Sequence, residues 1–147
     1  MKVLFESAQV TETEVLIRGD ITLAEVEALL DFVKGYNANT TKKLLLHRDD
    51  EQFLVSPSEV VYIEASNNKV EVVTTSAVYD SKKKLYELKE SLSTEPFAQI
   101  NKGTLVNIDF VKSVQAEFSG NYSLRLKTSK EILTISRKYF KEFKSKI

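Results

Sequence analysis

Two short groups of polar residues in the last third of the chain carry hydrogen-bond donors that could bind nucleic acid. The first is the run Asn101 to Thr104, which interrupts the otherwise apolar stretch Phe97 to Val111. The second is Arg137 with Lys138, in the segment Ile135 to Phe140. Amide, ammonium and guanidinium groups donate to phosphate oxygens and fit the acceptor edge of guanine. The residue types therefore predict contacts with a polyanion.

The sequence around these groups predicts rigid elements that would hold them in place. Asn101 and Gly103 are turn residues between β-favouring residues, so the first group is expected in a loop between two short buried strands. The second group precedes aromatic residues that could pack inward: Tyr139, Phe140 and Phe143. Asn107 stands between Val106 and Ile108, and we expect its amide to hold a turn rather than to touch DNA.

Composition limits the class of protein. With 147 residues the chain can form one domain, or one domain with a small appendage. It has no cysteine and one histidine, so we expect no disulfide, no metal site, no catalytic residue and no cofactor. We expect His47, at the end of an apolar run, to be structural or merely exposed rather than functional. No apolar run approaches the roughly 20 residues that span a bilayer, which predicts a cytoplasmic protein.

Charge is divided unevenly along the chain although the formal net charge is zero. Asp and Glu outnumber Lys and Arg by seventeen to eleven from Met1 to Pro96, whereas Lys and Arg lead by ten to four from Phe97 to Ile147. A basic C-terminal third favours binding of a polyanion by that part of the chain. The alternative is that the difference reflects uneven solvation only.

The first 41 residues predict a small strand-strand-helix appendage. Lys2 to Glu6 and Glu14 to Arg18 have the apolar cores of short strands. Thr22 is the expected N-cap of a helix that continues to Tyr36, with apolar residues at helical spacing and an acidic opposite side. The apolar stripe either packs on the neighbouring strands or docks a partner or a second copy of the chain. The polar link 37–41 is the expected boundary, which gives domains 1–41 and 42–147.

The rest of the chain predicts a mostly β (α+β) domain with antiparallel sheets and short helices. Expected strands cover residues 44–47, 52–55, 59–65, 69–75, 77–80, 97–100, 104–108, 111–118, 122–127 and 131–135. Ser81 is the expected cap of a helix that runs through Leu92, with Leu85, Leu88 and Leu92 on one face. The lysines at 82–84 would then oppose the dipole of that helix. They are either a solvated face or a contact for phosphate.

The ordered motifs from about Lys43 to Ile147 resemble those of the LytTR family of bacterial DNA-binding domains. The pieces that carry the resemblance are VVYIEASNNKVEVVT, KKLYELKESL, FAQINKGTLVNID and ILTISRKYFKEF. The resemblance implies a β-rich transcription regulator that reads direct repeats, as two copies, through loops in successive major grooves of double-stranded DNA. One position departs from the family pattern, because Gln99 stands where a basic residue is usual.

The resemblance also implies which residues contact DNA and which partners are present. Lys69, Asn101, Lys102 and Arg137 match the positions that read bases or contact the backbone, and Lys138 would add a phosphate contact. Forty-odd residues are too few for a receiver domain, so the chain resembles the receiver-less type. That type is commonly paired with a small membrane protein that restrains it. A homodimer on DNA and such a membrane partner are therefore expected by analogy.

Three alternatives remain open at this point. Arg137 could form a surface salt bridge instead of a DNA contact, and Tyr122 and Tyr139 could pack in the core or at its rim instead of along a phosphate backbone. The third alternative concerns the whole chain, which could be a protein-interaction module whose basic third binds an acidic protein or a membrane surface. An enzyme is the least favoured class, because no Ser/His/Asp set and no glycine-rich phosphate loop is present.

Overall fold

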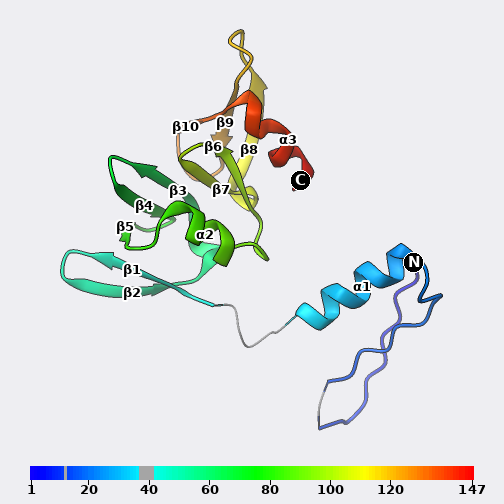
Figure 1. Ribbon diagram of the computed structural model, residues 1–147. Coiled ribbons are helices and arrows are strands. Elements are labelled where there is room, and N and C mark those ends of the chain that lie inside the picture. The colour runs from blue at the N-terminus through cyan, green and yellow to red at the C-terminus, as the bar shows by residue number, and fades with distance from the viewer. Residues whose placement is uncertain (12, 37–41) are drawn as a thin grey trace. The chain divides into compact units, whose positions relative to one another are not determined.

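The computed structural model describes residues 1–11, 13–36 and 42–147, which divide into two units (Figure 1). The first unit covers Met1–Thr40 and the second covers Thr41–Ile147. The polar link predicted at 37–41 lies outside the described residues. None of the helices in the described part is long and apolar enough to cross a membrane.

The first unit contains one helix, α1 (Ala24–Gly35), and no strand among its described residues. The predicted strands at Lys2 to Glu6 and Glu14 to Arg18 are therefore wrong, since both segments are irregular. A two-stranded hairpin is marginal in water unless a third strand or a packed helix covers it. Such a cover is missing here, because no described residue of this unit is buried. Short-range alternation alone was insufficient to form the strands.

The predicted helix is confirmed, but its cap is not Thr22. Leu23 occupies the N-cap position and makes no side-chain cap bond. Thr22 instead donates from its backbone nitrogen and its hydroxyl to the Asp20 carboxylate, at 2.9 and 2.6 Å. Of the predicted apolar stripe, Val26, Leu29, Leu30 and Val33 are half-buried, whereas Leu23 at the N-cap is exposed. The opposite side is exposed, including Phe32.

The second unit contains a seven-stranded antiparallel sheet, with strand order β2-β1-β5-β4-β3-β7-β6. Its strands are β1 (Leu44–Arg48), β2 (Glu51–Val55), β3 (Val60–Ser66), β4 (Lys69–Thr74), β5 (Val78–Ser81), β6 (Phe97–Asn101) and β7 (Thr104–Asn107). The positive φ values of Asn67 and Asn68, 51° and 63°, suit the tight β3–β4 turn. These strands and turns confirm the mostly β prediction.

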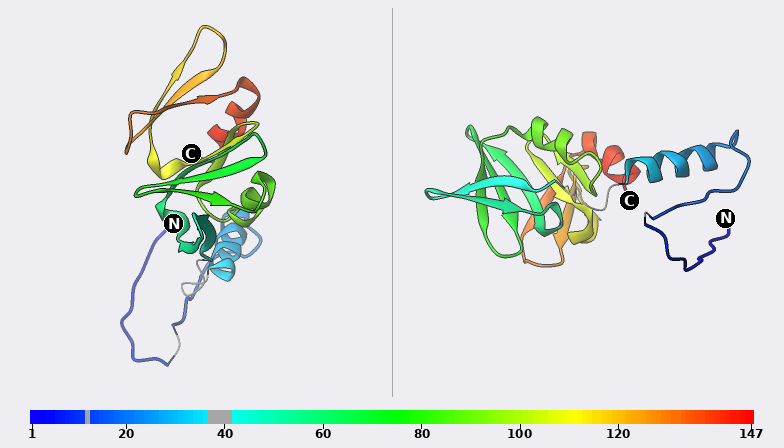
Figure 2. Two further views of the ribbon diagram at one scale, coloured as in Figure 1. Left: turned by 90° about the vertical axis from the view of Figure 1, so that its left-hand side faces the viewer. Right: turned by 90° about the horizontal axis from the view of Figure 1, so that it is seen from below.

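A second sheet has three antiparallel strands in the order β10-β9-β8. These strands are β8 (Val111–Ala116), β9 (Tyr122–Leu126) and β10 (Ile132–Ile135). The sheet lies at one end of the unit and the β1–β2 hairpin lies at the other (Figures 1 and 2). Tyr62 of β3 donates a hydrogen bond to Glu131 of the β9–β10 connection, which joins the two sheets. Burial and this carboxylate raise the pKa of the Tyr62 hydroxyl.

Helix α2 (Leu85–Ser91) begins later than predicted. Ser81 is the last residue of β5, and its hydroxyl accepts a hydrogen bond from the Lys83 nitrogen instead of capping the helix. Lys82 and Lys83 therefore precede the helix, and Lys84 occupies its N-cap. Their unfavourable interaction with the helix dipole is smaller than predicted, because none of them lies in the first turn. The apolar face is confirmed, because Leu88 and Leu92 are buried and Leu85 packs against the core.

Two hydrophobic clusters stabilise the second unit. One includes Leu88 and Leu92 with residues of β1, β2, β3, β4, β6 and β7. The other joins β3, β6 and β7 to the three-stranded sheet and to α3 (Arg137–Ser145), whose buried residue is Phe143. A register shift between Val60 and Tyr62 puts Val61 and Tyr62 in the same cluster, as a bulge allows. The second cluster therefore supports both polar groups predicted to bind nucleic acid.

Asn107 holds a turn, as predicted. It ends β7 and is buried, with its side chain 1% exposed. Its Nδ2 donates to the Val60 carbonyl at 2.9 Å, and its Oδ1 accepts from the Asp109 nitrogen at 3.0 Å. The second bond starts the single-turn helix η2 (Ile108–Phe110) and leads the chain into the second sheet.

Candidate nucleic-acid interface

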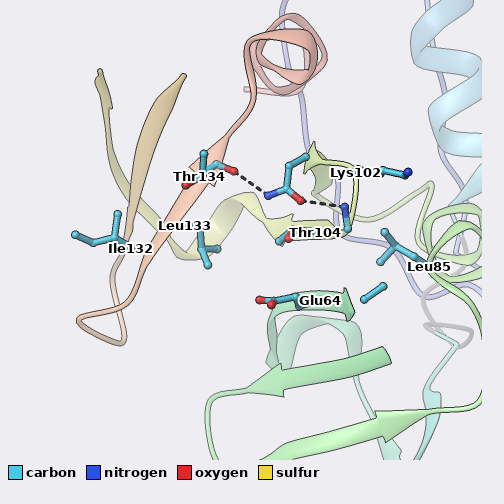
Figure 3. A pocket seen from close by; sticks show the side chains of 10 residues that line it. Glu64, Leu85, Lys102, Thr104, Ile132, Leu133 and Thr134 are labelled. Carbon is cyan, nitrogen blue, oxygen red and sulfur yellow. Dashed lines mark hydrogen bonds between the residues drawn. The ribbon is translucent and has the colours of Figure 1, made fainter. Parts of the chain in front are cut away.

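The β6–β7 turn presents Asn101 and Lys102, and its shape depends on the Asn101 amide. Asn101 Oδ1 accepts from the Gly103 nitrogen at 3.0 Å, and Asn101 Nδ2 donates to the Thr134 carbonyl at 2.9 Å (Figure 3). The turn is thus closed on itself and bonded to β10. Each amide atom keeps capacity for one further hydrogen bond, so contact with a base edge stays a prediction.

Gly103 lets this turn approach the β3–β4 hairpin closely. A Cβ atom at this position would lie 2.7 Å from the Ala65 carbonyl oxygen, a distance that real Cβ atoms avoid. The Ala65 nitrogen also donates to the Gly103 carbonyl at 2.7 Å. Lys69 lies on the neighbouring part of this hairpin, paired with Ser66. Lys69 therefore lies at the β3–β4 turn, which adjoins the β6–β7 turn that carries Asn101 and Lys102.

Lys69 has partners of its own in the described structure. Its Nζ lies 3.5 Å from the Glu71 carboxylate and 3.6 Å from that of Asp80. The Lys69 side chain is 59% exposed, and ion pairs this open contribute little to stability. Breaking them to contact a phosphate would therefore cost little.

Arg137 is the first residue of α3 and its side chain is exposed. Its backbone nitrogen donates to Asn121 Oδ1 at 3.3 Å, in the connection between β8 and β9. Its side chain crosses Gly120, where a Cβ would lie only 2.6 Å from Arg137 Cδ. Gly120 also has a φ of +89°, which disfavours other residues. The alternative of a surface salt bridge at Arg137 finds no ion pair among the described residues.

The two predicted groups are brought together in the fold. The Ser136 nitrogen donates to the Ile100 carbonyl at 2.8 Å, next to the bond between Asn101 and Thr134. These two bonds fix the N-terminal end of α3 beside the β6–β7 turn. Arg137 and Lys102 consequently extend from neighbouring, rigidly joined elements.

The first turn of α3 is basic, which suits an anion. It contains Arg137 and Lys138 and no acidic residue. Both cations oppose the helix dipole, whose positive end is at this terminus, and a bound phosphate would offset that repulsion. Lys138 is exposed, with its Nζ 5.9 Å from the centroid of the Tyr139 ring. Its side chain is therefore accessible to DNA.

The aromatic residues near the interface anchor α3. Tyr122 of β9 stacks on Phe140 with 3.6 Å between ring centroids and 12° between planes. Tyr122 and Tyr139 are half-buried, in agreement with rim packing. Phe143, at 2% exposure, closes the second cluster beneath the helix. The helix that carries Arg137 at its N-terminal end is thus anchored to the core by its C-terminal half.

A series of polar contacts links α2, β6 and α3 and was not predicted from the sequence. Lys89 Nζ donates to Gln99 Oε1 at 3.0 Å and pairs with Glu142 Oε1 at 2.8 Å. Gln99 Nε2 then donates to the Lys102 carbonyl at 3.2 Å. Gln99 therefore supports the turn from behind instead of offering a positive charge. Only its departure from the family pattern marked this position, and nothing in the sequence marks Lys89 or Glu142.

A groove of about 640 Å³ borders the same turn (Figure 3). It is lined by Glu64, Ala65, Leu85, Asn101, Lys102, Gly103, Thr104, Ile132, Leu133 and Thr134. No group of three or more metal-ligating side chains is found in the part of the chain that the structure describes. The groove thus adds no recognisable catalytic chemistry to the donors around it.

Comparison with known proteins identifies the family. The LytTr DNA-binding domain matches residues 50–147 of the chain. The chain belongs to the LytTR family. It is a DNA-binding transcriptional regulator, and the LytTR family is a non-enzymatic one.

Relatives of this LytTR protein are similar to it over different lengths of the chain. An uncharacterized HTH-type transcriptional regulator of Staphylococcus aureus (strain MSSA476) is 26% identical over 144 residues, which cover 98% of this chain and 95% of the relative. The sensory transduction protein LytT of Oceanobacillus iheyensis is 29% identical over 86 residues, 58% of this chain and 35% of that protein. The first unit is therefore included in the similarity to the staphylococcal protein.

A solved structure confirms the fold of the LytTR domain. It is the LytTr DNA-binding domain of a putative methyl-accepting/DNA response regulator from Bacillus cereus, with a TM-score of 0.67 and 21% identity. The similarity covers 73% of this chain and 97% of that one. The mostly antiparallel β architecture predicted from the sequence is shared by both.

Proposed function

We propose that this LytTR protein recognises direct repeats in duplex DNA, with one copy of the chain on each repeat. The observation that carries the proposal is the rigid junction of the β6–β7 turn and the N-terminal end of α3, which presents Lys102 and Arg137 together. Arg137 would donate two hydrogen bonds to guanine O6 and N7, the bidentate pattern that distinguishes this base in the major groove. Lys69, Lys102 and Lys138 would contact phosphates, and Asn101 a base edge.

Selection of bound fragments from random duplex DNA with the full chain tests this function. We expect enrichment of two similar sites in the same orientation, separated by about one helical turn of roughly 10 base pairs. Inserting about 5 base pairs between the sites turns one to the opposite face and should weaken binding, whereas about 10 should restore it. Absence of an enriched motif would sink the proposal of specific recognition.

Replacing Lys102 by alanine should mainly change the electrostatic part of binding. The plot of log K against log salt has a negative slope, and loss of one phosphate contact should reduce the magnitude of that slope by about 1. The same loss should weaken binding to all sequences alike. Titrations at several salt concentrations, on the selected duplex and on a scrambled one, measure both quantities. Leu54→Ala, at an exposed position on β2, serves as the control. An unchanged slope would remove Lys102 from the interface.

We also propose that the first unit contacts a second copy of the chain on DNA. The support is the half-buried stripe of α1 in a unit without a buried residue, together with the inclusion of this unit in the similarity to the staphylococcal regulator. Sedimentation of the full chain with a two-site duplex measures the pairing. A single bound copy at saturation would contradict it.

By family resemblance, a small membrane protein is the proposed regulatory partner, with the first unit as its contact. Cross-linking of the full chain in cells, followed by identification of the captured proteins, tests this partner. Recovery of no small membrane protein would reject it. Cytoplasmic location is part of the same proposal.

A further inference from the structure

The tip of the β8–β9 hairpin holds an unpacked aromatic side chain. Phe118 has a relative exposure of 112%, the largest of any exposed large apolar residue in the described structure. The tip itself is ordered by hydrogen bonds. Glu117 N donates to the Asn121 carbonyl at 2.9 Å, and Gly120 N donates to the Glu117 carbonyl at 3.1 Å. The ring is thus held in solvent by a closed turn.

Exposure alone would say little, because single apolar residues on a surface are common. The position of Phe118 beside Arg137 is what makes it informative. Gly120, two residues further on, touches the Arg137 side chain, and Asn121 Oδ1 accepts from the Arg137 nitrogen at 3.3 Å. The tip and the arginine therefore approach DNA as one body. Phe118 belongs to the same closed tip, two residues before the glycine over which the Arg137 side chain lies.

We infer that Phe118 packs against a thymine methyl group in the major groove, next to the base pair that Arg137 contacts. The thymine C5-methyl is the apolar group that base pairs present in this groove, and phenylalanine is among its known partners. Covering the ring would also remove apolar surface from water. This inference rests on the proposed function and adds a specificity-determining residue to it.

The decisive experiment combines a protein variant with a base analogue. The duplex used is the highest-affinity one recovered by selection. Each thymine near the guanine that Arg137 is proposed to contact is replaced in turn by deoxyuridine, which removes only the methyl group. One of these replacements should weaken binding of the unaltered chain about fourfold, the effect of one lost methyl contact. Phe118→Ala should weaken binding to the thymine duplex about tenfold. The same deoxyuridine replacement should then have no effect on the variant.

Controls separate this inference from folding and from the proposed function. Because Phe118 is fully exposed, its variant should unfold at the same urea concentration as the unaltered chain, and Leu54→Ala should leave DNA binding unchanged. Unchanged affinity of Phe118→Ala, in a chain where Arg137→Ala loses affinity, overturns this inference alone. Equal deoxyuridine effects on the variant and the unaltered chain also overturn it. If selection yields no motif, the proposed function fails and this inference fails with it.

Discussion

Arg137→Ala is expected to weaken binding to the selected duplex by about 1–3 kcal/mol, with relaxed preference at one base pair. The change removes a planar donor pair that fits guanine O6 and N7. The folded chain should be unaffected, because the Arg137 side chain is exposed and forms no ion pair in the described structure. Fluorescence anisotropy with the selected duplex and with single-base variants measures the loss.

Arg137→Lys provides the matched control. Lysine keeps the positive charge but lacks the bidentate geometry, so the salt dependence should persist while discrimination of guanine falls. Arg137→Ala binding its duplex unchanged would show that α3 does not read DNA. Equal losses on specific and scrambled duplexes would instead reduce Arg137 to a phosphate contact.

Phe143→Ala should lower the free energy of unfolding by about 3–5 kcal/mol, as large-to-small changes at buried aromatic residues do. Phe143 is the buried residue of α3 and belongs to the cluster shared by both sheets. Its loss leaves a cavity under the helix and removes the packing that holds Arg137 in position. Urea denaturation measures the stability, and anisotropy below the transition measures the accompanying loss of specific binding.

Two further variants make this result specific. Phe143→Leu retains most of the apolar volume and should cost clearly less than alanine. Phe118→Ala removes the same side chain from a fully exposed position and should change stability by less than about 0.5 kcal/mol. If Phe143→Ala were as stable as Phe118→Ala, α3 would not depend on the second cluster.

Strands and turns of the second unit could be predicted because each has a local cause. Alternating apolar residues specify one buried face, and Asn67, Asn68 and Gly120 supply the backbone conformations that the reversals need. The grouping of Asn101 and Lys102 with Arg137 followed from the order of the family motifs. The amide of Asn107 was also assigned correctly, since a polar side chain between two apolar residues needs internal partners when it is buried.

The remaining features depend on contacts between residues far apart in the sequence. Ser81 has the chemistry of a cap, yet the preceding strand extends to it. The first two predicted strands have suitable residues, but no described residue of the first unit is buried against them. Lys89, Gln99 and Glu142 lie on three elements, and only the packing of α2 and α3 around β6 makes them one chain of bonds. Asn101 could be selected from its position, but its bond to Thr134 could not.

The contact between Gly120 and Arg137 suggests how regulators of this kind can diverge in their target sites. The arginine rests on a hairpin tip, so the length and composition of that tip set how far and in which direction the guanidinium group extends. If Arg137 reads DNA as proposed, insertions in the tip would change the base pair within its reach without replacing the arginine. Two regulators with the same arginine would then bind different promoters. New regulatory circuits would arise from changes in one surface loop, with the packed interior left intact.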